Sequence, residues 1–285
     1  MKKILCPIDF SECSENAVAY AYELASSAGA DIVLCFAYPL PYTETESEKK
    51  AWASNHEEGI LNVRNELELA SRRLSRLNPE RNIKVDYIIR EGLAADIIPN
   101  VAISESADII VMGTKGAEGF RETLGTVSAA VINKVKVPVL VIPENSVYKP
   151  VKEIVYATDL EGVENQAVEF TIKLAELFNA HISFLSIQKE SDNVKDIGQV
   201  VEYAMDNLLN RSSYDNISFH LNEGKEVSEG ISIFAERKRA DLVVMASYEK
   251  SAFDRLFGRS HTREMVYHAS IPVLALHKTK EQVGA

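Results

Sequence analysis

Two short polar segments carry the residue types best suited to holding a phosphate-bearing ligand. The first follows an apolar run and reads Pro7-Ile8-Asp9-Phe10-Ser11. The second runs from Gly113 to Thr126, with further glycines at positions 116 and 125. Glycines let a backbone approach a polyphosphate closely and point its N–H groups at it, and Thr126 is suited to cap a helix or donate its hydroxyl to a phosphate. A carboxylate such as Asp9 can accept a hydrogen bond from an exocyclic amine or a ribose hydroxyl.

The segments that position these residues alternate between strand and helix patterns. Short runs rich in Val and Ile lack polar alternation, which is typical of parallel strands buried on both faces. In open parallel sheets ligands bind beyond the carboxyl ends of the strands, so both polar segments are expected at one edge of a doubly wound α/β sheet. The clearest predicted strands are 32–37, 85–89, 109–112 and 137–142, and the predicted helices are 14–28, 46–77 and 94–105.

The chain repeats this arrangement. Asp9 and Asp159, each after an apolar strand, are 150 residues apart, and Asp108 and Asp241 are 133 apart. SADIIVMGTKG matches RADLVVMASYE, and KVPVLVIP matches SIPVLALH. We therefore predict two tandem domains, residues 1–145 and 150–279, joined by a proline-flanked linker. The helices expected in the second copy are 163–178, 193–210 and 226–237.

These motifs resemble the universal stress protein family, twice over nearly the whole chain. The family pattern is Gly-x2-Gly-x9-Gly-Ser/Thr after the fourth strand, with an Asp after the first. The resemblance implies two five-stranded, adenine nucleotide α-hydrolase-like parallel sheets of strand order 3-2-1-4-5, and ATP binding, with or without Mg2+, by the first copy. Its candidate nucleotide-binding residues are Pro7, Asp9, Ser11, Ala37, Met112, Gly113, Thr114, Lys115, Gly116, Gly125, Thr126 and Val127.

Both copies depart from the family pattern. Eight residues separate Gly116 from Gly125, one fewer than the pattern, so the loop either tightens the phosphate site or leaves it unformed. The second copy departs further, because Ala246 and Glu249 stand at the first two glycine positions. A carboxylate there would repel a phosphate, so we predict that this copy has lost ATP binding. Glu161 and Glu164 also stand where the first copy has Ser11 and Ser14, and Arg259 stands at the third glycine position.

Composition narrows the function further. The 42 acidic and 31 basic residues give a net charge of −11, which disfavours nucleic acid and anionic membranes as partners. The first apolar run stops at Asp9, too short for a signal peptide, and no run approaches the roughly 18 apolar residues that span a bilayer, so we expect a cytoplasmic protein. Cys6 and Cys35 are interpreted as buried strand residues, and the six histidines show no metal-ligand spacing.

Three functions remain open. The favoured one is an ATP-binding regulatory protein of the stress response without efficient catalysis, because no Walker, GxGxxG or GxSxG motif is present. The second is a slow ATPase or nucleotidyl transferase that uses Lys115 or Arg121. The third is a tandem interaction module with unknown protein partners, in which neither copy binds nucleotide. The 46–81 segment is interpreted as an amphipathic helix that covers one face of the sheet, and the alternative is a lid over the nucleotide or a partner surface. The resemblance also implies that strands 137–142 and 272–276 pair, making one chain an intramolecular pseudo-dimer; a further homodimer is weakly favoured.

Overall fold

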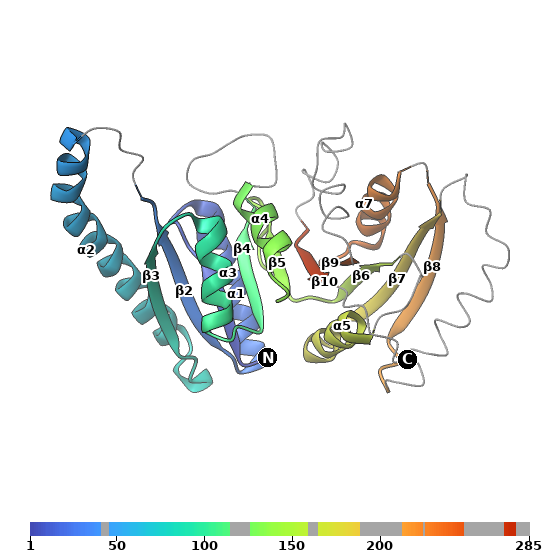
Figure 1. Ribbon diagram of the computed structural model, residues 1–285. Helices are drawn as coiled ribbons and strands as arrows, with labels where there is room; N and C mark the ends of the chain where they lie inside the picture. The colour runs from blue at the N-terminus through green and yellow to red at the C-terminus, as the bar shows by residue number, and fades with distance from the viewer. Residues whose placement is uncertain are drawn as a thin grey trace, which may run out of the picture. The chain divides into compact units, whose positions relative to one another are not determined.

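The computed structural model describes residues 1–40, 46–114, 126–158, 165–188, 213–224, 226–247 and 271–277. In the first repeat strands and helices alternate, as the sequence predicts (Figure 1). The first repeat contains β1 (Lys3–Pro7), α1 (Glu12–Ala28), β2 (Asp31–Tyr38), α2 (Glu46–Leu77), a 3-10 turn η1 (Pro79–Arg81), β3 (Val85–Glu91), α3 (Ala94–Ser104), β4 (Ile109–Gly113), α4 (Thr126–Lys134) and β5 (Val139–Ile142). The second contains β6 (Glu153–Ala157), α5 (Asn165–Phe178), β7 (His181–Gln188), β8 (Ile217–Glu223), α7 (Val227–Lys238), β9 (Leu242–Ser247) and β10 (Val273–His277). The predicted helix 193–210 lies outside the described residues.

Each repeat has the strand order that the resemblance implied. The first runs β3-β2-β1-β4-β5 and the second β8-β7-β6-β9-β10, which is 3-2-1-4-5 in both. The pairs β1–β2, β1–β4 and β2–β3 are parallel, as are β6–β7, β6–β9, β7–β8 and β9–β10. The prediction of a doubly wound α/β fold is therefore confirmed.

The last strand of the first repeat pairs with the last strand of the second. By their contacts the described residues form two compact units, residues 1–137 and residues from Pro138 onward, so β5 belongs to the second unit. There β5 and β10 are antiparallel, with Val141 opposite Val273 and Val139 opposite Ala275. The predicted pairing of the two final strands is confirmed, and each strand covers the other's edge.

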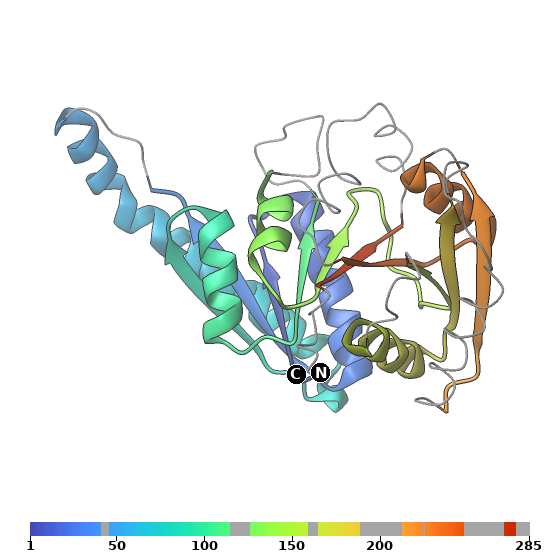
Figure 2. The same cartoon turned by 45° about the vertical axis from the view of Figure 1, so that its right-hand side comes forward.

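The apolar runs that predicted strands form the core. Ile4, Leu5, Ile109 and Ile110 lie on the paired strands β1 and β4 and are at most 1% exposed. Consecutive residues are buried because α1 and α3 cover opposite faces of the sheet (Figures 1 and 2). Burial on both faces explains why these runs show no polar alternation.

Helix α1 begins and ends at residues with clear physical roles. Ser11 is its N-cap, in extended conformation, and its hydroxyl oxygen accepts a hydrogen bond from the Ser14 amide. Glu12 and Glu15 place negative charge in the first turn, which suits the positive end of the helix dipole. Gly29 ends the helix in the left-handed conformation, with φ 64°. The helix starts two residues before the predicted Ser14, because the cap is Ser11.

Helix α2 lies along the edge of the first sheet. Leu67 and Leu74 are buried, and the Ser71 hydroxyl donates to the carbonyl of Val85 on β3. Nearer the start of the helix, His56 makes an edge contact with Tyr38, with ring centroids 5.2 Å apart. The helix thus covers β3 and the end of β2 (Figure 1), while its role as a lid stays a prediction.

The two repeats also match at the amino ends of their first strands. An Asp that precedes the fourth strand accepts two backbone N–H groups in each. Asp108 accepts the amides of Lys2 and Lys3, the latter at 3.0 Å. Asp241 accepts those of Lys152 and Glu153 at 2.8 and 3.1 Å. This shared contact fixes the alignment of the repeats independently of their sequence similarity.

Candidate functional site

The turn after β1 is held by Asp9 and Ser11. One Asp9 carboxylate oxygen accepts hydrogen bonds from the Ser11 amide at 3.1 Å and the Ser11 hydroxyl at 2.6 Å. The same Ser11 oxygen accepts the Ser14 amide at 3.2 Å, and the Ser14 hydroxyl donates to the Ser11 carbonyl at 2.9 Å. These bonds couple Asp9 to the first turn of α1, so the carboxylate is oriented before any ligand arrives.

Phe10, between these two residues, has a left-handed backbone with φ 61°. A non-glycine residue in this region costs on the order of 1 kcal/mol and persists only when its surroundings hold it there. The Phe10 ring packs on Phe36 of β2, with centroids 5.4 Å apart. The turn is therefore fixed on one side by hydrogen bonds and on the other by an aromatic contact.

The end of β4 lies against the start of α1. A Cβ added to Gly113 would lie 2.7 Å from Cys13 Sγ and 3.0 Å from the Cys13 carbonyl oxygen. The next residue, Thr114, places its Oγ1 3.7 Å from Cys13 Sγ. Close packing of α1 against β4 is thus a sufficient reason for glycine at position 113, apart from any phosphate.

Helix α4 is tied to the same strand end. The buried Ser128 hydroxyl donates to the Gly113 carbonyl at 2.9 Å. Ser128 is the third residue of α4, so this bond holds the first turn of the helix beside the carboxyl end of β4. The first N–H groups of a helix have no partner within it and attract anions. The arrangement therefore fits a phosphate group.

The strand register places three of the predicted residues on one face of the sheet. Leu5 of β1 pairs with Ile110 of β4, so Pro7 and Met112, two residues further on, point to the same face. Pro7 pairs with Cys35, which puts Ala37 on that face as well. Gly113 points to the opposite face, toward α1.

In each repeat an isoleucine fills the space between the end of the second strand and the helix packed beside it. This isoleucine comes from the helix in the first repeat and from the strand in the second. Matching hydrogen bonds, Gly92 N–H to Tyr38 and Gly224 N–H to Gln188, both 2.9 Å, align Ala37 with Ile187. Cβ atoms added to Gly92 and Gly224 would both lie 3.1 Å from an isoleucine, Ile97 of α3 in the first repeat and Ile187 of β7 in the second.

The helix residue facing Ile187 is Gly230, where an added Cβ would lie 2.8 Å from Ile187 Cδ1. Gly230 and Ile97 occupy the same position, since each donates its amide to the residue that caps its helix. The first repeat thus pairs a small strand residue with a large helix residue, and the second repeat reverses the sizes.

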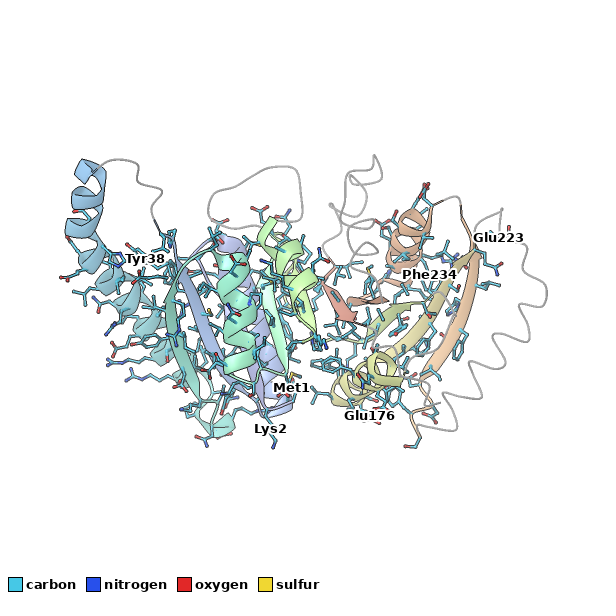
Figure 3. All side chains as sticks on the ribbon, in the orientation of Figure 1. Met1, Lys2, Tyr38, Glu176, Glu223 and Phe234 are labelled. Atoms are coloured by element: carbon cyan, nitrogen blue, oxygen red, sulfur yellow. The ribbon has the colours of Figure 1, made fainter. Side chains whose placement is uncertain are left out.

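The structure brings together part of the predicted site. Pro7 ends β1, and Asp9 and Ser11 follow it. Met112 and Gly113 end the neighbouring strand β4, and Thr114 follows directly. Ala37 lies one residue before Tyr38, which ends β2 (Figure 3). Thr126 and Val127 begin α4, whereas Lys115, Gly116 and Gly125 lie outside the described residues. In the second repeat Asp159, Glu161, Glu164, Glu249 and Arg259 also lie outside them.

Sequence reasoning missed two residues that shape this site. Cys13 sets the approach of α1 to Gly113, and Ser128 positions the start of α4. Neither residue belongs to the motif. The one available signal for Ser128 was a polar residue in the apolar stretch that follows Thr126.

The two strand cysteines near the site are chemically quiet. Burial raises the pKa of the Cys35 thiol to about 12 and raises that of Cys6 further. Both thiols are therefore protonated at neutral pH, and the thiolate is the reactive form. Cys6 and Cys35 are buried strand residues, as predicted, and Cys13 at the start of α1 is buried as well.

Within the described residues, no three metal-ligating side chains lie together, and no helix is long and apolar enough to cross a membrane.

Comparisons with known proteins agree with this architecture. The model of the universal stress protein family matches residues 1–143 and again residues 150–277. The chain is 30% identical to universal stress protein MJ0531 of Methanocaldococcus jannaschii over 53% of this chain and 85% of that protein. A universal stress protein from Archaeoglobus fulgidus superposes with a TM-score of 0.68 at 18% identity, covering 98% of this chain and 97% of that one. A solved universal stress protein in complex with cAMP covers 50% of this chain and 96% of its own, at 21% identity and a TM-score of 0.37. With the family's domain present twice, the chain belongs to the universal stress protein family.

Proposed function

We propose that the first repeat binds an adenine nucleotide, and ATP in particular, at the carboxyl ends of β1, β2 and β4. The observation that carries this proposal is the hydrogen bond from Ser128 to Gly113, which holds the start of α4 beside the end of β4. Unpaired helix N–H groups next to a glycine-containing strand end form a setting suited to phosphates.

The residues assigned to the nucleotide divide into two groups. Pro7, Asp9 and Ala37 would face the adenine, with Asp9 already oriented by Ser11. Met112, Gly113 and Thr114, together with Thr126 and Val127 of α4, would lie around the ribose and phosphates. Lys115, Gly116 and Gly125 complete the glycine motif, and Mg2+ would neutralise phosphate charge if it accompanies ATP.

The contrast between Ala37 and Ile187 supports the first repeat over the second. Ala37 is half-buried and leaves only a methyl group at the strand end, whereas Ile187 contacts the positions of Gly224 and Gly230. We infer that the second repeat has a structural or regulatory role. Binding of ATP to the first would then change a conformational or partner equilibrium in a stress response, without catalysis.

The tandem arrangement completes the proposal. The antiparallel β5–β10 pair would make one chain an intramolecular pseudo-dimer of domains 1–145 and 150–279. We propose that this cytoplasmic protein acts through protein partners, and that a homodimer of whole chains adds to the assembly.

The test is thermal unfolding of the whole chain with and without 1 mM MgATP. A micromolar dissociation constant predicts a stabilisation of about 4 kcal/mol. The informative variant is A37I/I97G, which installs the residue sizes of the second repeat in the first. We expect it to fold but to lose the ATP shift. Its matched control, I187A/G230I, makes the reverse exchange in the second repeat and should keep the shift.

A second pair of variants addresses the glycine motif. Gly116→Glu places a carboxylate at a motif glycine without touching Gly113, whose packing against Cys13 would confuse the result. The control Gly258→Glu places the same carboxylate in the second repeat, beside Arg259. Loss of the ATP shift in Gly116→Glu but not in Gly258→Glu supports the proposed site. No shift in the wild-type protein rejects nucleotide binding and favours a pure interaction module, while ATP turnover above about 1 per second would instead indicate an enzyme.

A further inference from the structure

A line of five polar side chains crosses three adjacent strands in the second repeat. It contains Glu153 on β6, His181 and Ser183 on β7, and Ser218 and His220 on β8. Glu153 pairs with His181 across β6 and β7, and Ser183 pairs with Ser218 across β7 and β8. Residues two apart on a strand share a face, so all five lie on one face of the sheet.

Hydrogen bonds connect them without a break. Glu153 Oε2 lies 2.9 Å from His181 Nδ1, and Glu153 Oε1 accepts the Ser183 hydroxyl at 2.5 Å. Ser183 Oγ lies 3.4 Å from Ser218 Oγ, which lies 2.9 Å from His220 Nε2. Ser183 is fully buried, so its hydroxyl depends on these partners.

The Glu153 carboxylate determines which group donates in each of these hydrogen bonds. Ser183 has one hydroxyl proton and gives it to Glu153, which only accepts. Ser218 must then donate to Ser183, and His220 Nε2 must donate to Ser218. Neutral His220 is therefore expected as the Nε2–H tautomer.

The other side of His220 faces positive charge. Its ring packs on Phe234 of α7, with centroids 4.9 Å apart. Arg237 and Lys238 of the same helix lie over the Phe234 ring, at 5.1 and 5.6 Å. Figure 3 shows Phe234 on α7, in the second repeat.

Burial, followed by Lys238, His181 and Arg237, lowers the pKa of His220, and Glu153 opposes them. As pH falls through the unfolded value of 6.5, the unfolded chain takes up its proton first. The stability that depends on neutral His220 is therefore present above this pH and is lost as the pH falls toward the folded pKa.

At the equivalent positions of β1, β2 and β3, which the structure describes, the first repeat carries no such row of side chains. The residues at the same register positions are Lys3, Asp31, Val33, Asp86 and Ile88. None of these side chains has an ordinary pKa between 5 and 8. Lys3 instead forms an ion pair with Glu105 at 3.1 Å.

We propose that this row of five side chains makes the second repeat acid-sensitive. Protonated His220 is repelled by Arg237 and Lys238, which loosens α7 from the sheet, while the corresponding helix α3 of the first repeat stays in place. The two repeats then differ in regulation as well as in ligand binding. The proposal does not depend on nucleotide binding.

Amide hydrogen exchange of the intact protein at pH 7.5, 6.5 and 5.5 tests this proposal, with protection corrected for the intrinsic exchange rate. We expect protection of α7 to fall with pH while α3, an internal control, keeps its protection. One proton changes the opening equilibrium by at most about tenfold per pH unit. The variant His220→Ile carries the residue found at this position in the first repeat, Ile88, and should remove the acid dependence. His56→Gln changes a histidine that is not one of the five polar side chains, so this variant should retain it. Acid-independent protection of α7, or unchanged acid dependence in His220→Ile, overturns the proposal.

Imidazole NMR of the wild-type protein gives a second test that does not require the variant to fold. We expect His220 to be the Nε2–H tautomer at neutral pH and to titrate below the unfolded value. An Nδ1–H tautomer contradicts the hydrogen-bond direction. Titration at or above the unfolded value contradicts the acid-sensing role.

Discussion

Replacement of Gly113 by alanine is expected to destabilise the first unit even without a ligand. The new Cβ would lie 2.7 Å from Cys13 Sγ, 3.0 Å from the Cys13 carbonyl oxygen and 3.1 Å from its carbonyl carbon. Optimal contacts between heavy atoms are about 3.5–4.0 Å, so α1 or β4 must move by several tenths of an ångström. Overpacking of this kind costs about 1–3 kcal/mol. In a unit of this size each kcal/mol lowers Tm by roughly 2–4 °C.

The sulfur and backbone contributions separate in a double-mutant cycle. Cys13→Ala removes the Sγ contact but leaves both carbonyl contacts, so it should rescue part of the loss in Gly113→Ala. Ser75→Ala, on the exposed side of α2, is the control and should change stability by less than about 0.5 kcal/mol.

Urea unfolding monitored by circular dichroism supplies the four free energies of the cycle. Wild-type stability in Gly113→Ala would show that α1 does not pack against this strand end as described. A Gly113→Ala loss with no rescue by Cys13→Ala would assign the cost to the backbone contacts alone.

Three further predictions concern other contacts. Because burial raises the pKa of Cys35 to about 12 and that of Cys6 further, a thiol reagent at pH 8 should label neither in the native protein and both after denaturation; rapid native labelling would refute their burial. Ser11→Ala removes the side-chain cap of α1 and the hydroxyl contact with Asp9 while the backbone contact remains, so the unfolding free energy should fall by about 1 kcal/mol, and an unchanged value would argue against the cap. Asp108→Ala and Asp241→Ala each leave two backbone N–H groups without their carboxylate, so each should destabilise its own unit by about 1–3 kcal/mol in local hydrogen exchange; a loss confined to one unit would contradict their equivalence.

The sequence predicted the strands well because burial on both faces leaves a direct trace in composition. The runs around Ile32 and Ile109 became β2 and β4 with their ends displaced by at most one residue. Strand order came from resemblance to a family, since periodicity within a strand says nothing about which strands are neighbours.

The contacts that shape the site were harder to predict because they join distant segments. Gly113 was interpreted through phosphate binding, while its packing against Cys13 depends on where α1 docks. To predict the exchange of side-chain sizes between Ile97 and Gly230, one must know how the helix is aligned against the strand. In β7 the alternation of His181 and Ser183 was visible, but its hydrogen-bonded partners lie on other strands.

The pairing of β5 with β10 has a consequence for synthesis on the ribosome. Val141 emerges long before its partner Val273, and at about 5–20 residues per second the intervening chain takes several seconds or more to translate. During that interval β5 has an open edge, a template for pairing with another nascent chain. Stop codons or proteolytic cuts ahead of β10 would therefore be expected to produce aggregates rather than a free, well-behaved first half.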